Sequence, residues 1–443
     1  MKAGAVDAVD GPPRQDVAVR PSGALSGALP APGSKSVTNR LLVLAALADG
    51  TSELIQPLDS DDSAAMRGVV EALGAAVAQH GSAWRVRGTG GSLTVPEQVL
   101  DARLSGTTMR FGAALAALAP VPVSLDGLPP LRRRPIAPLT AALRQLGASV
   151  DDTQGFPPLR VGGGLAGGAV TVDVSDSSQF ASAVLLAAPY ARRDVELRMA
   201  GRSATAYVDL TVAAMRAWGA EVLDLVPGSP GDGWRVRAGV GYRAQSTMVE
   251  HDASAAAHLY ALAAATGGTV TVTNAAQPTA QPDVAVLDLL VRMGCRVARG
   301  SDGVSVTGPP ALTPIDCDLS ALPDQVTTMA VLAALADGPS TLRGVAVART
   351  HETDRPAALA AELARAGVRV EQTPDSITVH GGTAAGPARL GTHDDHRLAM
   401  AFAAFGAAVD GIVVAEPWCV TKTYPGFWSD ARALGLSWVE VPA

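Results

Sequence analysis

The first stretch of this sequence that could do chemistry is APGSKSVTNR, residues 31–40. It sets Lys35 beside Ser36 and follows them with Arg40, about one helical turn further along. A nucleotide-binding phosphate loop requires the pattern G-x-x-x-x-G-K-[ST], and here Ser34 stands where the second glycine is needed. The stretch therefore predicts a site for a small phosphorylated acid rather than for a nucleotide.

Two carboxylates occur in motifs that also carry cations. Asp324 lies in LPDQVTT, and Glu352 lies in RTHETDR, three residues before Arg355. Lys422 follows in TKTYPGF. Carboxylates among cations suit acid and base catalysis on a polyanionic substrate. A plain ion pair on one helix face is the alternative for Glu352 and Arg355.

Further anion-binding groups occur in two other motifs. The segment LRRRPI ends its arginine run at Arg134, although a solvated basic loop would have the same composition. The segment SDSSQF offers Ser177, Ser178 and Gln179, neutral groups that could hydrogen-bond a phosphate or the hydroxyls of a ring.

The motif HDDHR, residues 393–397, raises the question of a metal site. No further ligand follows at a suitable spacing, and Arg397 would repel a metal cation. We therefore expect no metal ion at this motif.

Composition limits the classes of protein that are possible. The 443 residues favour two domains or a repeated architecture, and the formal net charge of −7 argues against a nucleic-acid partner. The sequence predicts no membrane segment and no secretory signal, with residues 1–14 as a disordered tail. Cys295, Cys317 and Cys419 form no CxxC pair, which favours buried thiols in a cytoplasmic protein.

The sequence repeats itself. The octapeptide VLAALADG occurs at residues 43–50 and again at 331–338. Six small-residue turns, each expected to end a helix before a strand, recur about every 70 residues. Their glycines are Gly74, Gly147, Gly219, Gly294, Gly367 and Gly435. Six units in two groups of three explain this spacing.

Each unit is expected to open its first helix with Ser, Thr or Asp, residue types that cap free backbone N–H groups. The six starts read SKSVTNR, SGTTMR, SDSSQF, HDASAA, PDQVTT and HDDHR. If these helix N-termini point the same way, their partial positive charges would add to the nearby cations and form one local anion site.

Taken in order, these motifs resemble the 5-enolpyruvylshikimate-3-phosphate synthase family, the 3-phosphoshikimate 1-carboxyvinyltransferases. The series runs through PGSKSVTNR, SGTTMR, RRPI, SSQF, VEHDAS, LPDQ, HETDR, DDHR and TKTYPGF. Any single motif is weak evidence for the family, but the ordered series is specific to it and covers nearly the whole chain.

The resemblance implies an α/β (α+β) fold of six βαβαββ units, three in each of two domains with a pseudo-threefold arrangement. We expect the N-terminal domain to comprise residues 34–247. The C-terminal domain would comprise residues 15–33 together with 248–443, with the active site in the cleft between the domains.

The resemblance also implies an activity. Members transfer the enolpyruvyl group of phosphoenolpyruvate to the 5-hydroxyl of shikimate 3-phosphate and release phosphate, in the shikimate pathway to chorismate and aromatic amino acids. The addition gives a tetrahedral intermediate, and no cofactor takes part. We expect a cytoplasmic monomer with these two small-molecule substrates and with glyphosate as an inhibitor that competes with phosphoenolpyruvate.

Family roles map onto matching positions of this chain. Asp324 would accept the hydroxyl proton, and Glu352 would transfer the proton at C3, with Lys35 and Lys422 as further catalytic candidates. The shikimate 3-phosphate set is Lys35, Ser36, Arg40, Ser177, Ser178, Gln179, Asp324 and His351. The phosphoenolpyruvate set is Lys35, Gly106, Arg134, Gln179, Arg355, Arg397 and Lys422.

Three positions depart from the family pattern. Leu104 and Val347 each stand where relatives have an asparagine, and His351 replaces a lysine, which suggests a pH-sensitive charge at the substrate. A further substrate serine, nearest to Ser203, is ambiguous in register.

Two other functions remain as alternatives. The carboxyvinyltransferase that acts on UDP-N-acetylglucosamine uses a cysteine in its first domain, whereas all three cysteines here lie in the second half. An RNA 3′-terminal phosphate cyclase is built from related units but needs a nucleotide site and a nucleic-acid surface.

Overall fold

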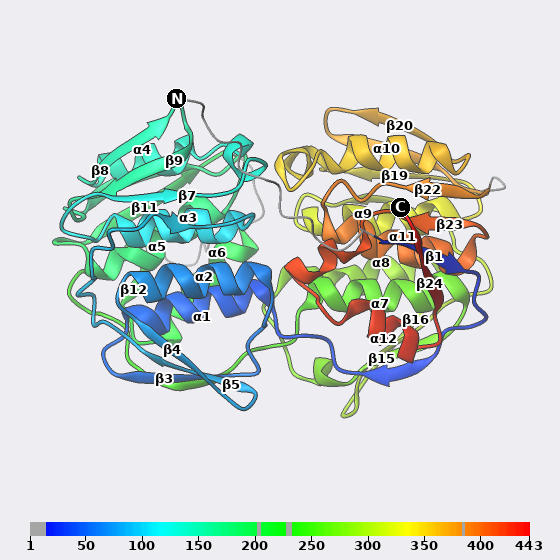
Figure 1. The fold of residues 1–443 in the computed structure, drawn as a ribbon, viewed down its shortest axis with the longest axis horizontal. Helices are drawn as coiled ribbons and strands as arrows, with labels where there is room; N and C mark the ends of the chain where they lie inside the picture. The colour runs from blue at the N-terminus through cyan, green and yellow to red at the C-terminus, as the bar shows by residue number, and fades with distance from the viewer. Residues whose placement is uncertain (1–14, 202–204, 227–232, 383–385) are drawn as a thin grey trace, which may run out of the picture.

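The computed structural model describes residues 15–201, 205–226, 233–382 and 386–443. The predicted tail at residues 1–14 and the ambiguous Ser203 lie outside these ranges. Figure 1 shows the chain as two halves side by side, with α1–α6 in one half and α7–α12 in the other.

The first half contains three sheets with their helices. The first unit comprises α1 (Lys35–Leu47), β3 (Thr51–Ile55), α2 (Asp61–Ala72), β4 (Ala76–His80), β5 (Ala83–Arg87) and β14 (Ser246–Met248). The second comprises β6 (Leu100–Asp101), α3 (Gly106–Ala116), β7 (Val123–Asp126), α4 (Ala137–Gln145), β8 (Ser149–Thr153) and β9 (Phe156–Gly162). The third comprises β10 (Gly168–Asp173), α5 (Gln179–Ala187), β11 (Val195–Ala200), α6 (Ala206–Ala217), β12 (Val222–Asp224) and β13 (Trp234–Val236).

The second half repeats this arrangement. The fourth unit comprises β2 (Gly27–Leu29), α7 (Ala253–Thr266), β15 (Thr269–Val272), α8 (Val286–Arg292), β16 (Arg296–Gly300) and β17 (Gly303–Thr307). The fifth comprises β18 (Asp316–Asp318), α9 (Val326–Leu335), β19 (Pro339–Arg343), α10 (Arg355–Arg365), β20 (Arg369–Thr373) and β21 (Ser376–His380). The sixth comprises β22 (Ala388–Leu390), α11 (His396–Ala408), β23 (Ile412–Val414), α12 (Phe427–Ala433), β24 (Ser437–Pro442) and β1 (Gln15–Arg20).

Within the described ranges the six sheets each have four strands in the same order. In the second unit β6 pairs parallel with β7, and β9 then pairs antiparallel with both β7 and β8. The six-unit βαβαββ prediction is confirmed.

Three units borrow a strand from a distant part of the chain. β14 joins the first sheet, β2 joins the fourth, and β1 lies between β23 and β24 in the sixth. The chain therefore crosses between the halves twice, and the crossing segments run side by side. Gly33 bridges His251, and the Ser34 amide donates to the Glu250 carbonyl at 2.8 Å.

The first helix of each unit is buried on nearly all sides, and the second is amphipathic. In α1, α3, α5, α7, α9 and α11 almost every residue is buried, as expected for helices that form the centre of a core. Buried apolar residues form two separate clusters, one within residues 37–249 and one within residues 17–31 and 255–436.

The predicted glycine turns are confirmed. Each of the six glycines lies just after a second helix and has a positive φ, between 85° for Gly367 and 109° for Gly74. Glycine adopts this left-handed conformation without the steric penalty of a Cβ atom. No helix in the described ranges is long and apolar enough to cross a membrane.

A methyl group at Gly33 tests the packing of the crossing segments. A Cβ there would lie 2.4 Å from the Gln56 carbonyl oxygen and 3.1 Å from the Leu58 nitrogen, both backbone atoms. We expect Gly33→Ala to lower the free energy of unfolding by about 1–3 kcal/mol, measured by urea denaturation. Gly23→Ala is the control, because a Cβ there meets nothing within 4 Å. Equal stability of the two variants would contradict this packing.

Candidate active site

A cavity between the two halves collects most of the predicted site residues. It encloses about 810 Å³ of space, part of it open to solvent. Its lining includes Lys35, Ser36, Arg40, Gly106, Arg134, Ser177, Ser178, Gln179, Asp324, His351 and Glu352. The remaining predicted residues, Arg355, Arg397 and Lys422, are hydrogen-bonded or ion-paired to these carboxylates.

The starts of the six first helices converge on this cavity. Residues at the starts of α1, α3, α5 and α9 line it directly. The other two reach it through contacts: Asp252, before α7, accepts from the Lys35 amide at 2.9 Å, and Arg397 of α11 donates to Asp324 at 2.8 Å. The predicted local focus of helix N-termini is therefore present.

Capping alone does not account for all six polar helix starts. Ser34, Ser105, Asp252 and Asp395 each accept a hydrogen bond from a backbone amide of their own helix. The starts of α5 and α9 have no side-chain cap. At these two starts Ser178 and Asp324 line the cavity, which leaves their oxygens for other partners.

The guanidinium of Arg355 is the centre of the site. It is fully buried, and it donates to Asp395 Oδ2 at 2.7 Å, to Asp324 Oδ1 at 2.8 Å and to Glu352 Oε2 at 2.9 Å. The Glu352 contact is not the helix-face pair considered from the sequence, because α10 begins only at Arg355. One side chain thus fixes both proposed acid and base groups.

Cations keep Asp324 ionised. Burial alone would raise the pKa of Asp324, but Arg397 and Arg355 outweigh burial and lower it well below its usual range. Arg397 Nη2 donates to Asp324 Oδ2 at 2.8 Å, so each carboxylate oxygen accepts from a different arginine.

Glu352 has a similar environment. Its Oε1 lies 3.1 Å from Lys422 Nζ and 3.7 Å from Arg134 Nη1. Burial alone would raise the pKa of Glu352, but Lys422, Arg134 and Arg355 lower it well below its usual range. Lys422 also donates to the Leu104 carbonyl at 3.1 Å, so the halves meet at this lysine. Because Lys422 contacts the backbone carbonyl of Leu104, this hydrogen bond does not depend on which side chain stands at position 104.

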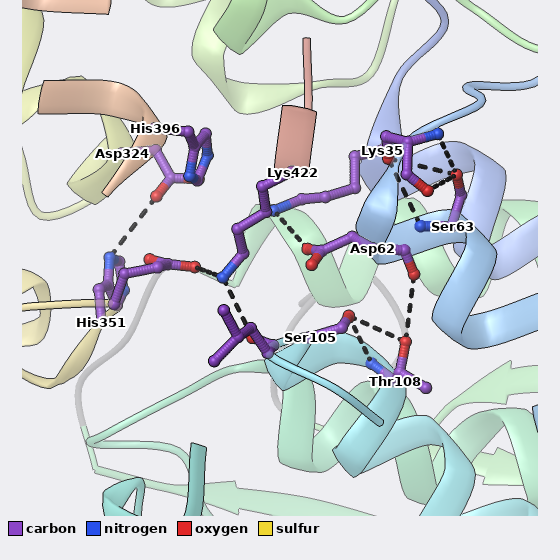
Figure 2. Close-up of polar contacts among 12 residues, drawn as sticks. Lys35, Asp62, Ser63, Ser105, Thr108, Asp324, His351, His396 and Lys422 are labelled. Carbon is purple, nitrogen blue, oxygen red and sulfur yellow. Dashed lines mark hydrogen bonds and ion pairs between the residues drawn. The ribbon is translucent and has the colours of Figure 1, made fainter. Parts of the chain in front are cut away.

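Lys35 has a partner that sequence reasoning missed. Its ammonium lies 3.3 Å from Asp62 Oδ2 at the start of α2, a contact drawn in Figure 2, where Lys422 extends into the same space from the other half. Asp62 is buried, and its backbone carbonyl accepts from Thr108 at 3.3 Å. The only signal in the sequence was an aspartate pair after Ser60, which reads as an ordinary helix start.

Two cations of the cavity remain without a carboxylate partner among the described residues. Arg40 donates to Thr211 and to the carbonyls of Ser36 and Tyr207, and Arg110 donates to Gln179 Oε1 at 2.7 Å. Burial lowers the pKa of Arg40 to about 10, and burial with Arg134 lowers that of Arg110 to about 9. Both stay charged at neutral pH and can meet anionic ligands.

Arg110 and Tyr207 were not among the predicted site residues, yet both line the cavity. Arg110 was visible in SGTTMR as a cation near a helix start. Tyr207 comes from the first turn of α6, where no motif marked it.

His351 corrects one expectation. Burial, with Arg355, lowers the pKa of His351 to about 3, so this ring is neutral and carries no charge that changes between pH 5 and 8. Its Nδ1 lies 2.8 Å from Arg355 Nη1 and must accept there, because arginine can only donate. Val347, the second departure from the family pattern, also lines the cavity.

The HDDHR motif distributes its side chains in different directions. His393 contacts Glu362 at 2.9 Å, Asp395 binds Arg355, and Arg397 binds Asp324. His396 is fully buried, and neither ring nitrogen has a hydrogen-bond partner among the residues that the structure describes. Burial lowers its pKa, the charges of nearby Lys35 and Lys422 add to this effect, and no motif gave it a role of its own. Figure 2 shows it in the same region as Lys422.

The described residues contain no group of three or more His, Cys, Asp or Glu side chains placed to hold a metal ion. Burial raises the pKa of Cys295 and Cys317 to about 11 and that of Cys419 to about 12. None of the three thiols lines the cavity.

Comparison with known proteins settles the family. The model of the family described as EPSP synthase (3-phosphoshikimate 1-carboxyvinyltransferase) matches residues 19–430. The chain belongs to this family. It is 41% identical to the 3-phosphoshikimate 1-carboxyvinyltransferase of Methanoculleus marisnigri, over 95% of this chain and 99% of that protein. It is 39% identical to the Nostoc punctiforme protein of the same name, over 90% and 94% of the two chains.

Solved structures agree with the EPSP synthase assignment. EPSP synthase from Acinetobacter baumannii superposes with a TM-score of 0.80 at 25% identity, over 96% of this chain and 100% of that one. The enolpyruvyl transferase NikO from Streptomyces tendae, at 19% identity and a TM-score of 0.77, shares the fold. Membership of this family does not favour the two alternative functions, the carboxyvinyltransferase that acts on UDP-N-acetylglucosamine and the RNA 3′-terminal phosphate cyclase.

The lowered pKa of Asp324 predicts how its contribution to stability depends on pH. A carboxyl whose pKa is depressed in the folded state stabilises the fold above its unfolded pKa, about 3.9, and that stabilisation is lost as the pH falls further. We expect Asp324→Asn to be less stable than the wild type at pH 6. Below pH 4 the difference should shrink, by up to about 1.4 kcal/mol per pH unit.

Urea denaturation at pH 6, 4 and 3 measures this difference. Asp59→Asn is the matched control, because Asp59 is exposed and forms no ion pair with the described residues. A stability difference for Asp324→Asn that stays constant down to pH 3 would show that the arginines do not hold this carboxylate ionised.

Proposed function

We propose that this enzyme transfers the carboxyvinyl group of phosphoenolpyruvate to the 5-hydroxyl of shikimate 3-phosphate, giving 5-enolpyruvylshikimate 3-phosphate and phosphate. The observation that carries the proposal is the charge of the cavity. The cations in and around it are Lys35, Arg40, Arg110, Arg134, Arg355, Arg397 and Lys422. They outnumber the carboxylates that line the cavity or contact its residues, Asp62, Asp252, Asp283, Asp324, Glu352 and Asp395, in a chain whose formal net charge is −7.

This excess suits two phosphorylated carboxylic acids bound together. Phosphoenolpyruvate would lie against Gly106, Arg134, Arg397 and Lys422, close to Glu352. Shikimate 3-phosphate would be held by Ser36, Arg40, Ser177, Ser178, Gln179 and His351, with Asp324 at the hydroxyl that reacts. Lys35, between the two groups, would contact both substrates.

Arg355 would act through its contacts rather than as a free anion ligand. Its donors already engage Asp324, Glu352, Asp395 and His351, and it does not line the cavity. Direct binding of phosphoenolpyruvate by Arg355 would require one of these contacts to open.

The addition step needs a base at the hydroxyl and an acid at C3 of phosphoenolpyruvate. The hydroxyl oxygen bonds to C2 while its proton passes to Asp324, and C3 takes a proton from Glu352. Since Glu352 is ionised in the free enzyme, it must first gain a proton. The anionic groups of phosphoenolpyruvate offset the charges of Lys422 and Arg134, which raises the pKa of Glu352 again.

The elimination step reverses the proton transfer at C3. The bond from C2 to the phosphate oxygen breaks, phosphate leaves, and Glu352 takes back a proton from the methyl group that C3 has become. The neighbouring cations stabilise the departing phosphate. Lys35 and Lys422 are the further candidates for the C3 proton.

We also infer that the two apolar clusters correspond to two domains, with boundaries near residue 33 and near residue 248. The pairing of Met248 in the first sheet supports a second boundary one residue beyond Thr247. A monomeric state and a cytoplasmic location stay predictions from the sequence.

Phosphate release from the purified enzyme tests the reaction. We expect turnover with phosphoenolpyruvate and shikimate 3-phosphate, and none when UDP-N-acetylglucosamine replaces the latter. Asp324→Asn should lower kcat by about 10²- to 10⁴-fold, the usual effect of one acid/base group, while Asp59→Asn keeps the wild-type rate. Phosphate release with UDP-N-acetylglucosamine, but not with shikimate 3-phosphate, would overturn the proposal.

Solvent deuterium tests the role of Glu352 separately. In D₂O the reversible protonation at C3 should place deuterium in the methylene group of phosphoenolpyruvate, and Glu352→Gln should slow this by at least about 10²-fold. Mass spectrometry of recovered phosphoenolpyruvate measures the exchange. Deuterium incorporation at the wild-type rate in Glu352→Gln would assign the proton transfer at C3 to Lys35 or Lys422.

Gly106 predicts a substrate-specific effect. A Cβ there would lie 2.6 Å from Arg134 Nη1, so alanine must push this guanidinium away from the proposed phosphoenolpyruvate site. We expect Gly106→Ala to raise KM for phosphoenolpyruvate roughly tenfold, about 1.4 kcal/mol, and to weaken glyphosate inhibition. KM for shikimate 3-phosphate should change little.

Gly68→Ala is the control for this measurement, because a Cβ at Gly68 meets nothing within 4 Å. An unchanged KM for phosphoenolpyruvate in Gly106→Ala would show that Gly106 and Arg134 are not part of the phosphoenolpyruvate site.

A further inference from the structure

A second cavity lies wholly within the second half, away from the proposed chemistry. It is bounded by α7, by a 3₁₀ turn at Pro282–Ala285, by the start of α8 and by β16 and β17. It encloses about 610 Å³ of space, part of it open to solvent. Its apolar wall consists of Ala253, Ala256, Ala275, Val284, Val286, Leu287 and Val304. An apolar wall with a few polar groups is the usual lining of sites for small organic molecules.

Two buried polar side chains face this cavity without protein partners. His251 is 6% exposed and Tyr260 is 3% exposed, and both belong to the lining. No hydrogen bond joins either side chain to a group in the described part of the chain. Their polar atoms are not among the buried atoms that solvent cannot reach, so water or a ligand in the cavity can bind the imidazole and the hydroxyl.

Arg299 provides a charge at the rim. It is an exposed residue of β16, it is the one cation of the lining, and it forms no ion pair within the described ranges. It lies close enough to Tyr260 to oppose the effect of burial, which raises the pKa of that phenol. A guanidinium beside a hydroxyl, above an apolar wall, suits a carboxylate attached to an apolar body.

We propose that this cavity binds a small organic acid with an apolar, ring-sized body. Its carboxylate accepts from Arg299 and from the Tyr260 hydroxyl, and its body packs on Ala256, Val286 and Leu287. The lining has one cation, Arg299 at the rim, and one carboxylate, Asp283 at the floor. This charge and the apolar wall favour an acid with a single charged group at the rim over inorganic phosphate, which would leave the wall uncovered.

The floor of this cavity is connected to the proposed active site. Asp283 lines the second cavity, and its carboxylate accepts from Tyr207, which lines the first, and from Gln325 Nε2 at 2.6 Å. Gln325 is the neighbour of Asp324. A ligand against Asp283 therefore bears on two contacts of the substrate cavity, and its affinity should depend on whether shikimate 3-phosphate is bound.

Benzoate is a suitable probe, with benzamide and inorganic phosphate as comparisons in ligand-observed NMR titrations of the full chain. We expect saturable binding of benzoate, and binding about tenfold weaker in Arg299→Gln and in Tyr260→Phe. Arg296→Gln, an exposed arginine of the same strand outside the cavity, should bind as the wild type does. All three variants should keep the wild-type kcat, which shows that they are folded.

Several outcomes would overturn the proposal. These are no saturable benzoate binding, wild-type affinity in Arg299→Gln, or displacement of benzoate by equimolar phosphate or benzamide. The first two would mean that the cavity holds only water or that benzoate binds elsewhere.

The connection to the active site has its own readout. We expect the Kd for benzoate to change at least about threefold when shikimate 3-phosphate is saturating. An unchanged Kd would overturn the connection. Only this part rests on the proposed function, since binding of benzoate to the free enzyme does not depend on what reaction is catalysed.

Discussion

The site depends on one buried arginine. A guanidinium cannot lose its charge at any ordinary pH, so its transfer out of water must be offset by carboxylates with good geometry. Asp324, Glu352 and Asp395 provide them, and each comes from a different segment around the second-half core. Burying Arg355 costs free energy, but the same side chain holds the proposed base and the proposed acid at fixed positions.

The repeat explains how so many charged groups reach one place. Buried first helices expose their backbone N–H groups at the same end of each half, and a short polar residue there is either a cap or a ligand. Ser34 and Asp395 are caps. Ser178 and Asp324 have no capping bond and face the cavity instead. The second helices cover the outside, but the first turns of three of them also reach the site, with Asp62 of α2, Tyr207 of α6 and Arg355 of α10.

Sequence patterns predicted the repeat and most of the site, because both leave local signals. A glycine such as Gly74 is required by a positive φ, and Lys35 or Asp324 lies in a recognisable motif. Contacts between distant segments leave no such signal. The partner of Lys35, the neutral state of His351 and the position of Tyr207 depend on packing between elements more than 25 residues apart or on burial, neither of which periodicity records.

The most direct measurement is kcat for Arg355→Lys beside Arg365→Lys, an exposed arginine of the same helix. A lysine keeps the charge but cannot contact Asp324, Glu352 and Asp395 together, so the proposed base and the proposed acid would lose their common contact. We expect kcat to fall by at least about 10²-fold in Arg355→Lys at saturating substrates, with Arg365→Lys unchanged. A folded Arg355→Lys enzyme with a kcat close to that of the wild type would contradict the central role of this arginine.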